Sequence, residues 1–275
     1  ALLNSLRFGP LVEVQNRNLF DGVVRGISWY GNCIGVPNVG GEVSFSTSYS
    51  GNPLINAMCV GLVEKGGLVR AKASGRGNLL ILVGADTGRD GIHGASGLAS
   101  RTFEEEREMR PTVQVGNPFL EKVLIEACLE AVNTGHVIAM QDLGAAGLTS
   151  TVVESVARGG SGAILDIARV PRREEGMTPY EVMLSESQER MLVVVTGEHE
   201  EAVRRVFDKW DLESTVIGRV TDDGMVSVYD GDSLVASLPV EVLTDPPLYR
   251  LQGVSPTYLE ETRSINLDDL PVPTG

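Results

Sequence analysis

Asp142 stands where a strand is expected to end, in a segment whose residue types could support metal chemistry. The apolar run from Val137 to Met140 predicts a strand, and Asp142 follows it just before small residues that open a helix. Ligands of α/β folds commonly lie at such carboxyl ends, and Mg²⁺ favours one or two carboxylates together with phosphate oxygens. Asp142 is therefore a candidate magnesium ligand. The alternative is a cap on the following helix, worth about 1 kcal/mol, and the residues alone leave both interpretations open.

Two further polar segments could recognise a small polar ligand. Glu186, Ser187 and Gln188 stand directly before an expected strand over 190–195, and Gln114 lies between two valines. Side chains of this kind offer the few hydrogen-bonding groups that orient a ligand in a pocket. A polar turn between two buried elements is the commoner explanation for the first segment. A solvent-facing position on a strand would equally explain Gln114.

A glycine-rich loop over 87–97 follows the expected strand over 79–83. Its glycines leave backbone N–H groups free to face an anion, so a phosphate or nucleotide loop is one hypothesis. The spacing matches neither the dinucleotide-binding nor the Walker pattern. Taken alone, the loop is better explained as a surface loop in which His93 is merely hydrogen-bonded. Pairing of Arg89 with Asp90 is an equally good interpretation of those two charges.

Alternating helices and strands must position these residues. Asn16 or Asn18 is the expected cap of the first helix, and Asn117 is the expected cap of the helix that Pro118 opens. The order of elements predicts helices layered on a sheet, with a domain boundary in the glycine-rich stretch 66–77. The expected helices cover 17–34, 118–132, 148–157, 179–184 and 200–210, and the expected strands cover 42–48, 55–64, 79–83, 137–140, 163–167, 190–195, 216–220, 225–229 and 234–238.

Charge and composition argue against several classes of protein. The 23 basic and 37 acidic residues give a net charge of -14, which repels the phosphate backbone of nucleic acid. No apolar run reaches the roughly 18 residues of a membrane span, and no signal-peptide pattern opens the sequence, so we expect a cytoplasmic protein without a membrane partner. Cys33, Cys59 and Cys128 lack metal-site spacing, and we expect three buried thiols. The sequence opens inside a strand pattern without Met, so we expect a longer natural polypeptide.

Several strings, taken together, resemble one enzyme family. They are LNSLRFG at 3–9, YGNCIGVP at 30–37, VGGEV at 39–43, GRDGIHGA at 88–95, QDLGAAGL at 141–148, MTPYE at 177–181 and MLSESQERML at 183–192. In this order, from residue 1 to about residue 250, they resemble the small form of phosphoribosylformylglycinamidine synthase. Each string is weak alone, but a chance assembly of all of them in one order is implausible.

The resemblance implies a fold of two parts, each built as in the aminoimidazole ribonucleotide synthetase superfamily. Residues 1–68 would be the C-terminal part of an α/β domain that forms an eight-stranded barrel by pairing with a second such domain. Residues 69–248 would be a complete α+β domain with helices on a mixed sheet. Residues 249–275 would be a linker toward a second repeat. The expected fold class is therefore α/β followed by α+β.

The resemblance also assigns roles to individual residues. Gln114, Glu186, Ser187 and Gln188 match the family's contacts to formylglycinamide ribonucleotide, and Asp142 matches a magnesium ligand. The family's catalytic His and its ATP-contacting Lys and Tyr would lie before Ala1, so we expect no catalytic residue in this chain and no synthase activity from it alone. Asn4 departs from the Asp that many relatives carry at the matching place.

The resemblance implies an ATP-dependent C–N ligase of purine biosynthesis. ATP would phosphorylate the formamide oxygen, with Mg²⁺ as cofactor, and ammonia would then displace phosphate to give the amidine. The ammonia would come from a separate glutaminase subunit joined by a small bridging protein. Two alternatives are another ATP-dependent enzyme of the same superfamily and a non-catalytic scaffold for binding or dimerisation.

Overall fold

The computed structural model of the chain describes residues 1–92, 114–245 and 248–266. It divides into two compact units, Ala1–Thr244 and Asp245–Gly275. The described part of the second unit contains the short helix α8 (Tyr258–Ser264). Residues His93 to Gly97, the second part of the expected glycine-rich loop, lie outside the described residues. No helix in the described ranges is long and apolar enough to cross a membrane.

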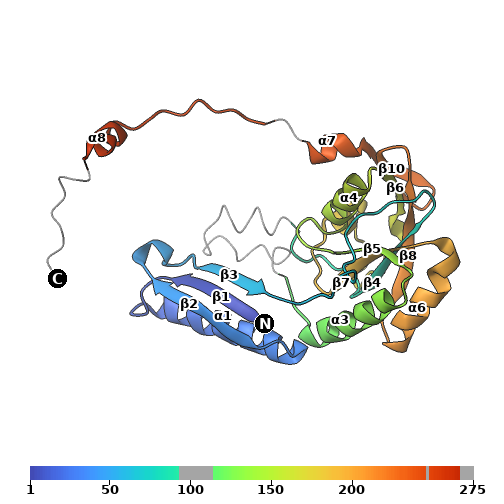
Figure 1. Cartoon of the computed structure of the whole chain (residues 1–275), viewed down its shortest axis with the longest axis horizontal. Helices are drawn as coiled ribbons and strands as arrows, with labels where there is room; N and C mark the ends of the chain where they lie inside the picture. The colour runs from blue at the N-terminus through green and yellow to red at the C-terminus, as the bar shows by residue number, and fades with distance from the viewer. Residues whose placement is uncertain (93–113, 246–247, 267–275) are drawn as a thin grey trace. The chain divides into compact units, whose positions relative to one another are not determined.

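A three-stranded sheet with one long helix opens the first unit. Strands β1 (Leu2–Phe8), β2 (Asn38–Phe45) and β3 (Leu54–Cys59) lie in the order β2-β1-β3. Helix α1 (Val14–Ile34) connects the parallel pair β1 and β2, while β3 returns antiparallel to β1 (Figure 1). Phe8 is fully buried, with its ring 5.1 Å from that of Phe20 and at a near right angle to it. The aromatic contact therefore fixes α1 on its sheet.

Helix α1 begins earlier than the sequence predicts. Its N-cap is Glu13, which makes no side-chain capping bond, so the expectation that Asn16 or Asn18 caps the helix is wrong. Asn16 is buried within the first turn instead, and its amide donates to Pro10 O and Glu13 Oε2. The polar side chain thus braces the chain that leads into the helix. At the other end, Gly35 adopts a φ of 76°, which favours glycine and ends the helix.

A seven-stranded mixed sheet forms the remainder of the first unit, in the order β10-β9-β6-β8-β4-β7-β5. Neighbouring strands are antiparallel except β6 and β9, which are parallel. The mixed sheet expected for this region is therefore confirmed. The strands are β4 (Leu79–Gly84), β5 (Val137–Asp142), β6 (Gly162–Asp166), β7 (Arg190–Val195), β8 (Ser214–Thr221), β9 (Met225–Asp230) and β10 (Ser233–Pro239).

Helices cover both faces of this sheet (Figure 1). Leu80 and Leu82 of β4 point into one hydrophobic cluster, whereas Ile81 and Val83 point into the other, as the two-residue period of a strand requires. The first cluster packs under α4 (Gly147–Gly159), α5 (Pro179–Leu184) and α7 (Val240–Thr244). The second packs under α3 (Pro118–Asn133) and α6 (Glu200–Lys209). Covered on both faces, the central strands can be apolar throughout.

Local sequence signals place several helix ends correctly. Asn117 Oδ1 accepts the Leu120 backbone N–H at 3.2 Å, so the predicted cap of α3 is confirmed. Helix α5 begins with a capping box between Thr178 and Glu181. Helices α7 and α8, which span five and seven residues, were not predicted from the sequence. The expectation of three buried thiols is wrong, because Cys128 is buried while Cys33 and Cys59 are exposed.

Phe207 offers a test of the packing between α6 and the sheet. Its side chain is fully buried in the second cluster, whereas Phe119 on α3 is 74% exposed. Phe207→Ala should lower the free energy of unfolding by about 3 to 5 kcal/mol, because it removes buried apolar surface and leaves a cavity. Phe119→Ala should change it by less than about 0.5 kcal/mol. Denaturant unfolding measures both, and equal losses would contradict the described core.

Candidate functional site

The sheet order brings three polar segments to one edge. Strand β7 lies between β4 and β5 and is antiparallel to both, so the start of β7 lies beside their ends. Arg190 at the start of β7 pairs with Gly84 at the end of β4, and the next residue, Met191, pairs with Asp142 at the end of β5. The loop after β4, the segment before β7 and the turn after β5 therefore meet, although about a hundred residues separate the first two.

Glu186 is the centre of this meeting point and is only 4% exposed. Its backbone N–H donates to Asp90 O at 2.8 Å. One carboxylate oxygen accepts the Ala146 N–H at 2.9 Å, and the other accepts the amide of Gln114 at 2.5 Å. The amide of Gln188 in turn donates to Gln114 Oε1 at 2.9 Å. Three of the four predicted substrate contacts thus converge, and the two amides lie at the accessible side.

Ser187 faces the interior instead. It is 1% exposed, accepts the Gly88 N–H at 2.9 Å and donates to the carboxylate of Asp90. Its neighbour Ser185 is equally buried and donates to Gly88 O at 2.6 Å. The two hydroxyls bind the glycine-rich loop to the segment that carries Glu186 and Gln188.

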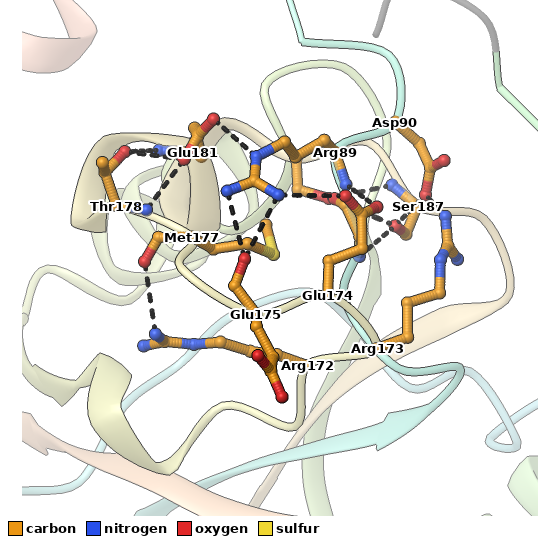
Figure 2. Close-up of polar contacts among 12 residues, drawn as sticks. Arg89, Asp90, Arg172, Arg173, Glu174, Glu175, Met177, Thr178, Glu181 and Ser187 are labelled. Carbon is orange, nitrogen blue, oxygen red and sulfur yellow. Dashed lines mark hydrogen bonds and ion pairs between the residues drawn. The ribbon is translucent and has the colours of Figure 1, made fainter.

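The described part of the glycine-rich loop is anchored by charge as well. Figure 2 shows Arg89 between two glutamates, with Nε 2.8 Å from Glu181 Oε1 and Nη1 3.1 Å from Glu174 Oε2. Asp90 forms an ion pair with Arg173. The interpretation that Arg89 pairs with Asp90 is therefore wrong, since each finds a partner on the segment before α5. Thr87 and Asp90 are buried, so this part of the loop is not a free surface loop.

Glycine is required where the loop passes Glu186. Gly91 has a φ of 62°, and a Cβ built on it would lie 2.6 Å from the Cβ of Glu186 and 3.0 Å from the Cγ of Gln114. Gly147 makes a similar approach after Asp142, because a Cβ there would lie 1.9 Å from Ser185 O. The main chain of two segments thus approaches the site as closely as atoms allow.

Asp142 lies at the end of β5 with its side chain exposed. Helix α4 begins at Gly147 after Ala146 and has no side-chain cap, so the interpretation of Asp142 as a helix cap is wrong. Burial and the negative charges of Glu189 and Asp142 raise the pKa of Glu121, which lies in the first turn of α3 after the N-cap Asn117, whose N–H donates to Glu189. Within the described ranges, no three His, Cys, Asp or Glu side chains are grouped to hold a metal. A cation at Asp142 would need further oxygen ligands.

Two family models match the chain. The model described as the AIR synthase related protein, C-terminal domain matches residues 75–231, and the corresponding N-terminal domain model matches residues 1–63. Together they cover the three-stranded sheet, strands β4 to β9 of the seven-stranded sheet and the converging polar residues, but not β10. The chain belongs to the AIR synthase related protein family.

Close relatives within this family carry one name. The chain is 58% identical over 272 residues to phosphoribosylformylglycinamidine synthase subunit PurL of Thermomicrobium roseum, and 54% identical over 274 residues to that of Moorella thermoacetica. These alignments cover 98% and 99% of the chain but 37% of each relative. The chain therefore spans little more than a third of the length of these relatives.

Solved structures of Thermotoga maritima PurL share the fold. The structure described as PurL complexed with FGAR is 40% identical, with a TM-score of 0.83, and the match covers 93% of this chain and 41% of that one. A structure complexed with ATP and one described as PurLQS match with TM-scores of 0.78 and 0.79 at 38% identity.

Glu189 and Arg190 of this AIR synthase related chain were not predicted to belong to the site. Arg190 is 2% exposed, and its guanidinium donates to Ser187 O at 2.8 Å, Ser185 O at 2.7 Å and Thr87 Oγ1 at 2.9 Å. Burial lowers its pKa to about 10, which leaves the side chain charged at neutral pH. The available signal was an arginine that opens an otherwise apolar strand, since such a charge must find partners when buried.

The ion pair of Arg89 and Glu181 should make stability depend on pH. The Arg89 guanidinium and the Thr178 N–H hold the pKa of Glu181 at about 2, below its ordinary 4.5. The contribution of ionised Glu181 is thus complete above about pH 4.5 and is lost as the pH falls toward about 2. Glu181→Gln should reduce the free energy of unfolding at pH 7, and the difference from the parent should shrink between pH 5 and about pH 3.

Glu175→Gln is the matched control, because Glu175 reaches Arg89 only through its backbone carbonyl (Figure 2). It should leave the pH dependence close to that of the parent. Denaturant unfolding at each pH makes the comparison, and a Glu181→Gln difference that is constant with pH would contradict the assigned ion pair.

Proposed function

We propose that this chain is part of an ATP-dependent ligase that converts formylglycinamide ribonucleotide, ammonia and ATP to formylglycinamidine ribonucleotide, ADP and phosphate. The observation that carries the proposal is the convergence of Gln114, Glu186 and Gln188 beside the turn that follows Asp142. Family membership and the names of close relatives agree with it, as do T. maritima PurL structures complexed with FGAR and with ATP. The reaction would serve purine biosynthesis.

The amides are suited to hold a formylglycinamide group. Each primary amide both donates and accepts, so Gln114 and Gln188 can pair with the N–H and C=O groups of an amide substrate. Glu186 fixes the orientation of the Gln114 amide by accepting one of its N–H groups. Ser187 would act from beneath, through the loop that it holds. A preorganised set of this kind orients a substrate at low entropic cost.

Asp142 is proposed to hold Mg²⁺ against the phosphates of ATP. The carboxylate is exposed, ends a strand and does not cap α4, so it is free to meet a bound cation. The ion would offset negative charge on the phosphoryl group during its transfer to the formamide oxygen. Phosphorylation would make that oxygen a leaving group. The nearby carboxylates of Glu121 and Glu189 add negative potential at the same edge.

The proposed assembly includes other subunits in the cytoplasm. Ammonia would come from a glutaminase subunit joined by a small bridging protein, and the solved PurLQS structure from T. maritima supports a complex of this kind. Burial and the charge of Glu121 raise the pKa of Cys128 to about 12, so this thiol is unsuited to release ammonia by nucleophilic attack.

We also propose that residues 1–68 contribute to a barrel with a second domain. Their exposed apolar residues, including Phe45 and Met58, are what such pairing would cover.

Gly91→Ala tests the substrate site through its crowding. The new methyl group would displace Glu186 and Gln114, so calorimetric titration of the natural polypeptide should give a Kd for formylglycinamide ribonucleotide at least about tenfold higher. Gly231→Ala is the matched control, because Gly231 has nearly the same φ, 61°, with nothing within 4 Å of the new Cβ. Both variants carry the backbone strain, and only the first should weaken binding. Gln188→Ala should weaken it as well. Equal affinities for the parent and the Gly91 and Gln188 variants would refute the site.

Asp142→Asn tests the metal role in the natural polypeptide supplied with ammonia. The concentration of Mg²⁺ that gives half-maximal activity should rise at least about tenfold, since the variant loses an anionic ligand. Asp232→Asn is the control, because Asp232 is exposed in the turn before β10. Strand β10 and strand β5, which carries Asp142, are the two outermost strands of the sheet. Superimposable magnesium titrations for the parent and Asp142→Asn would exclude the proposed ligand.

A further inference from the structure

Glu189 has a positive φ, a backbone conformation that residues other than glycine rarely adopt. Its φ is 57°. The residue lies between Gln188 and Arg190, so it directly follows one of the two proposed recognition amides, Gln114 and Gln188. Such left-handed positions at residues other than glycine, asparagine or aspartate persist where surrounding contacts impose them, and they cluster at functional sites. Glu189 is also buried, with 7% of its surface exposed. A strained, buried carboxylate beside a ligand site requires an explanation in terms of its partners.

Its partners hold both its backbone and its side chain. The carbonyl oxygen accepts the Ala85 N–H at 2.9 Å, and Gly84 must be glycine because a Cβ there would lie 2.1 Å from that oxygen. The side-chain Oε1 accepts the Tyr30 hydroxyl at 2.8 Å and the Asn117 N–H at 3.0 Å. One carboxylate oxygen therefore joins helix α1 to the N-terminal end of α3. The two helices contact each other.

Both recognition amides are connected to this oxygen. Gln188 precedes Glu189 in the chain, and Gln114 stands three residues before Asn117. Between them, Gly116 lies against the Tyr30 ring, since a Cβ on Gly116 would be 3.1 Å from Cε2 of that ring. A displacement of Tyr30 would therefore act on the segment that delivers Gln114 and on the segment that delivers Gln188.

Tyr30 is a dependable donor in this contact. Burial, the hydrogen bond to Glu189 and the negative charge of Glu121 all raise the pKa of its phenol, so the hydroxyl keeps its proton. A hydrogen bond to a carboxylate is among the stronger kinds in proteins, and its geometry is narrow. The contact can thus fix where α1 stands relative to the recognition segments.

We propose that the Tyr30–Glu189 hydrogen bond is a positioning contact through which α1 sets the placement of Gln114 and Gln188. This inference rests on the proposed function for its ligand. The Tyr30 hydroxyl donates to Glu189, which is not one of the proposed substrate contacts, so Tyr30 acts through Glu189 and not on the ligand. The first sheet and its helix would therefore tune the affinity of a site built by the second sheet.

Tyr30→Phe in the natural polypeptide is the test, because it removes the hydroxyl and keeps the ring against Gly116. The Kd for formylglycinamide ribonucleotide should rise about three- to tenfold, the loss expected for one hydrogen bond. The KM for this substrate should rise while kcat and the KM for ATP stay unchanged. Tyr229→Phe, on a strand four positions away from β7 in the sheet, should alter none of these values. Glu189→Gln keeps an acceptor oxygen and should retain more affinity than Glu189→Ala.

Hydrogen exchange distinguishes failure of this inference from failure of the proposed function. In Tyr30→Phe the Asn117 amide, which donates to Glu189, should exchange at least about threefold faster than in the parent. If the parent binds the nucleotide, an unchanged Kd in Tyr30→Phe overturns the positioning contact. If the parent binds none, the proposed function fails, and the exchange at Asn117 decides alone: faster exchange supports the contact, and unchanged exchange overturns it.

Discussion

The insertion of β7 between β4 and β5, antiparallel to both, is the constraint on which the candidate site depends. It places the start of one strand beside the ends of two others, so that three polar segments meet at one sheet edge. Parallel strands in these positions would have sent the segment before β7 to the opposite edge. The ladder from Gly84↔Arg190 to Leu79↔Val195 fixes this register with apolar side chains on both faces. A one-residue shift of this register would turn each β7 side chain to the opposite face of the sheet. The polar segment before β7 would then be displaced from the site.

Burial of polar groups at this edge imposes a second requirement, since each must find a partner. Arg190 donates to Ser187, Ser185 and Thr87, while Ser187 binds the loop at Gly88 and Asp90. Because a buried charge without partners is costly, these contacts form or fail together. The network supports the accessible amides from below. Rigid support of this kind is what a recognition site needs if its geometry is to stay within narrow bounds.

The two sheets differ in how completely the described chain covers their faces. The seven-stranded sheet has its own helices on both faces and its central strands are buried, although its edge strand β10 is exposed. The three-stranded sheet has a helix on one face, and β2 is exposed along its whole length. The proposed packing of the first sheet against a further domain would cover its exposed face and explain this asymmetry. The proposed recognition site depends on the second sheet, and the Tyr30 hydroxyl links helix α1 to that site through Glu189.

Local patterns in the sequence determined most of the elements. The helix over 179–184 and the strand over 190–195 have the predicted bounds, because a capping box and an unbroken apolar run are local signals. The resemblance named Gln114 and Glu186 as site residues, but no spacing in the chain says that they touch. That contact, the inward turn of Ser187 and the roles of Glu189 and Arg190 were decided by strand order. Pairing between residues far apart in sequence depends on the whole sheet, and only the folded chain brings those residues within hydrogen-bonding distance.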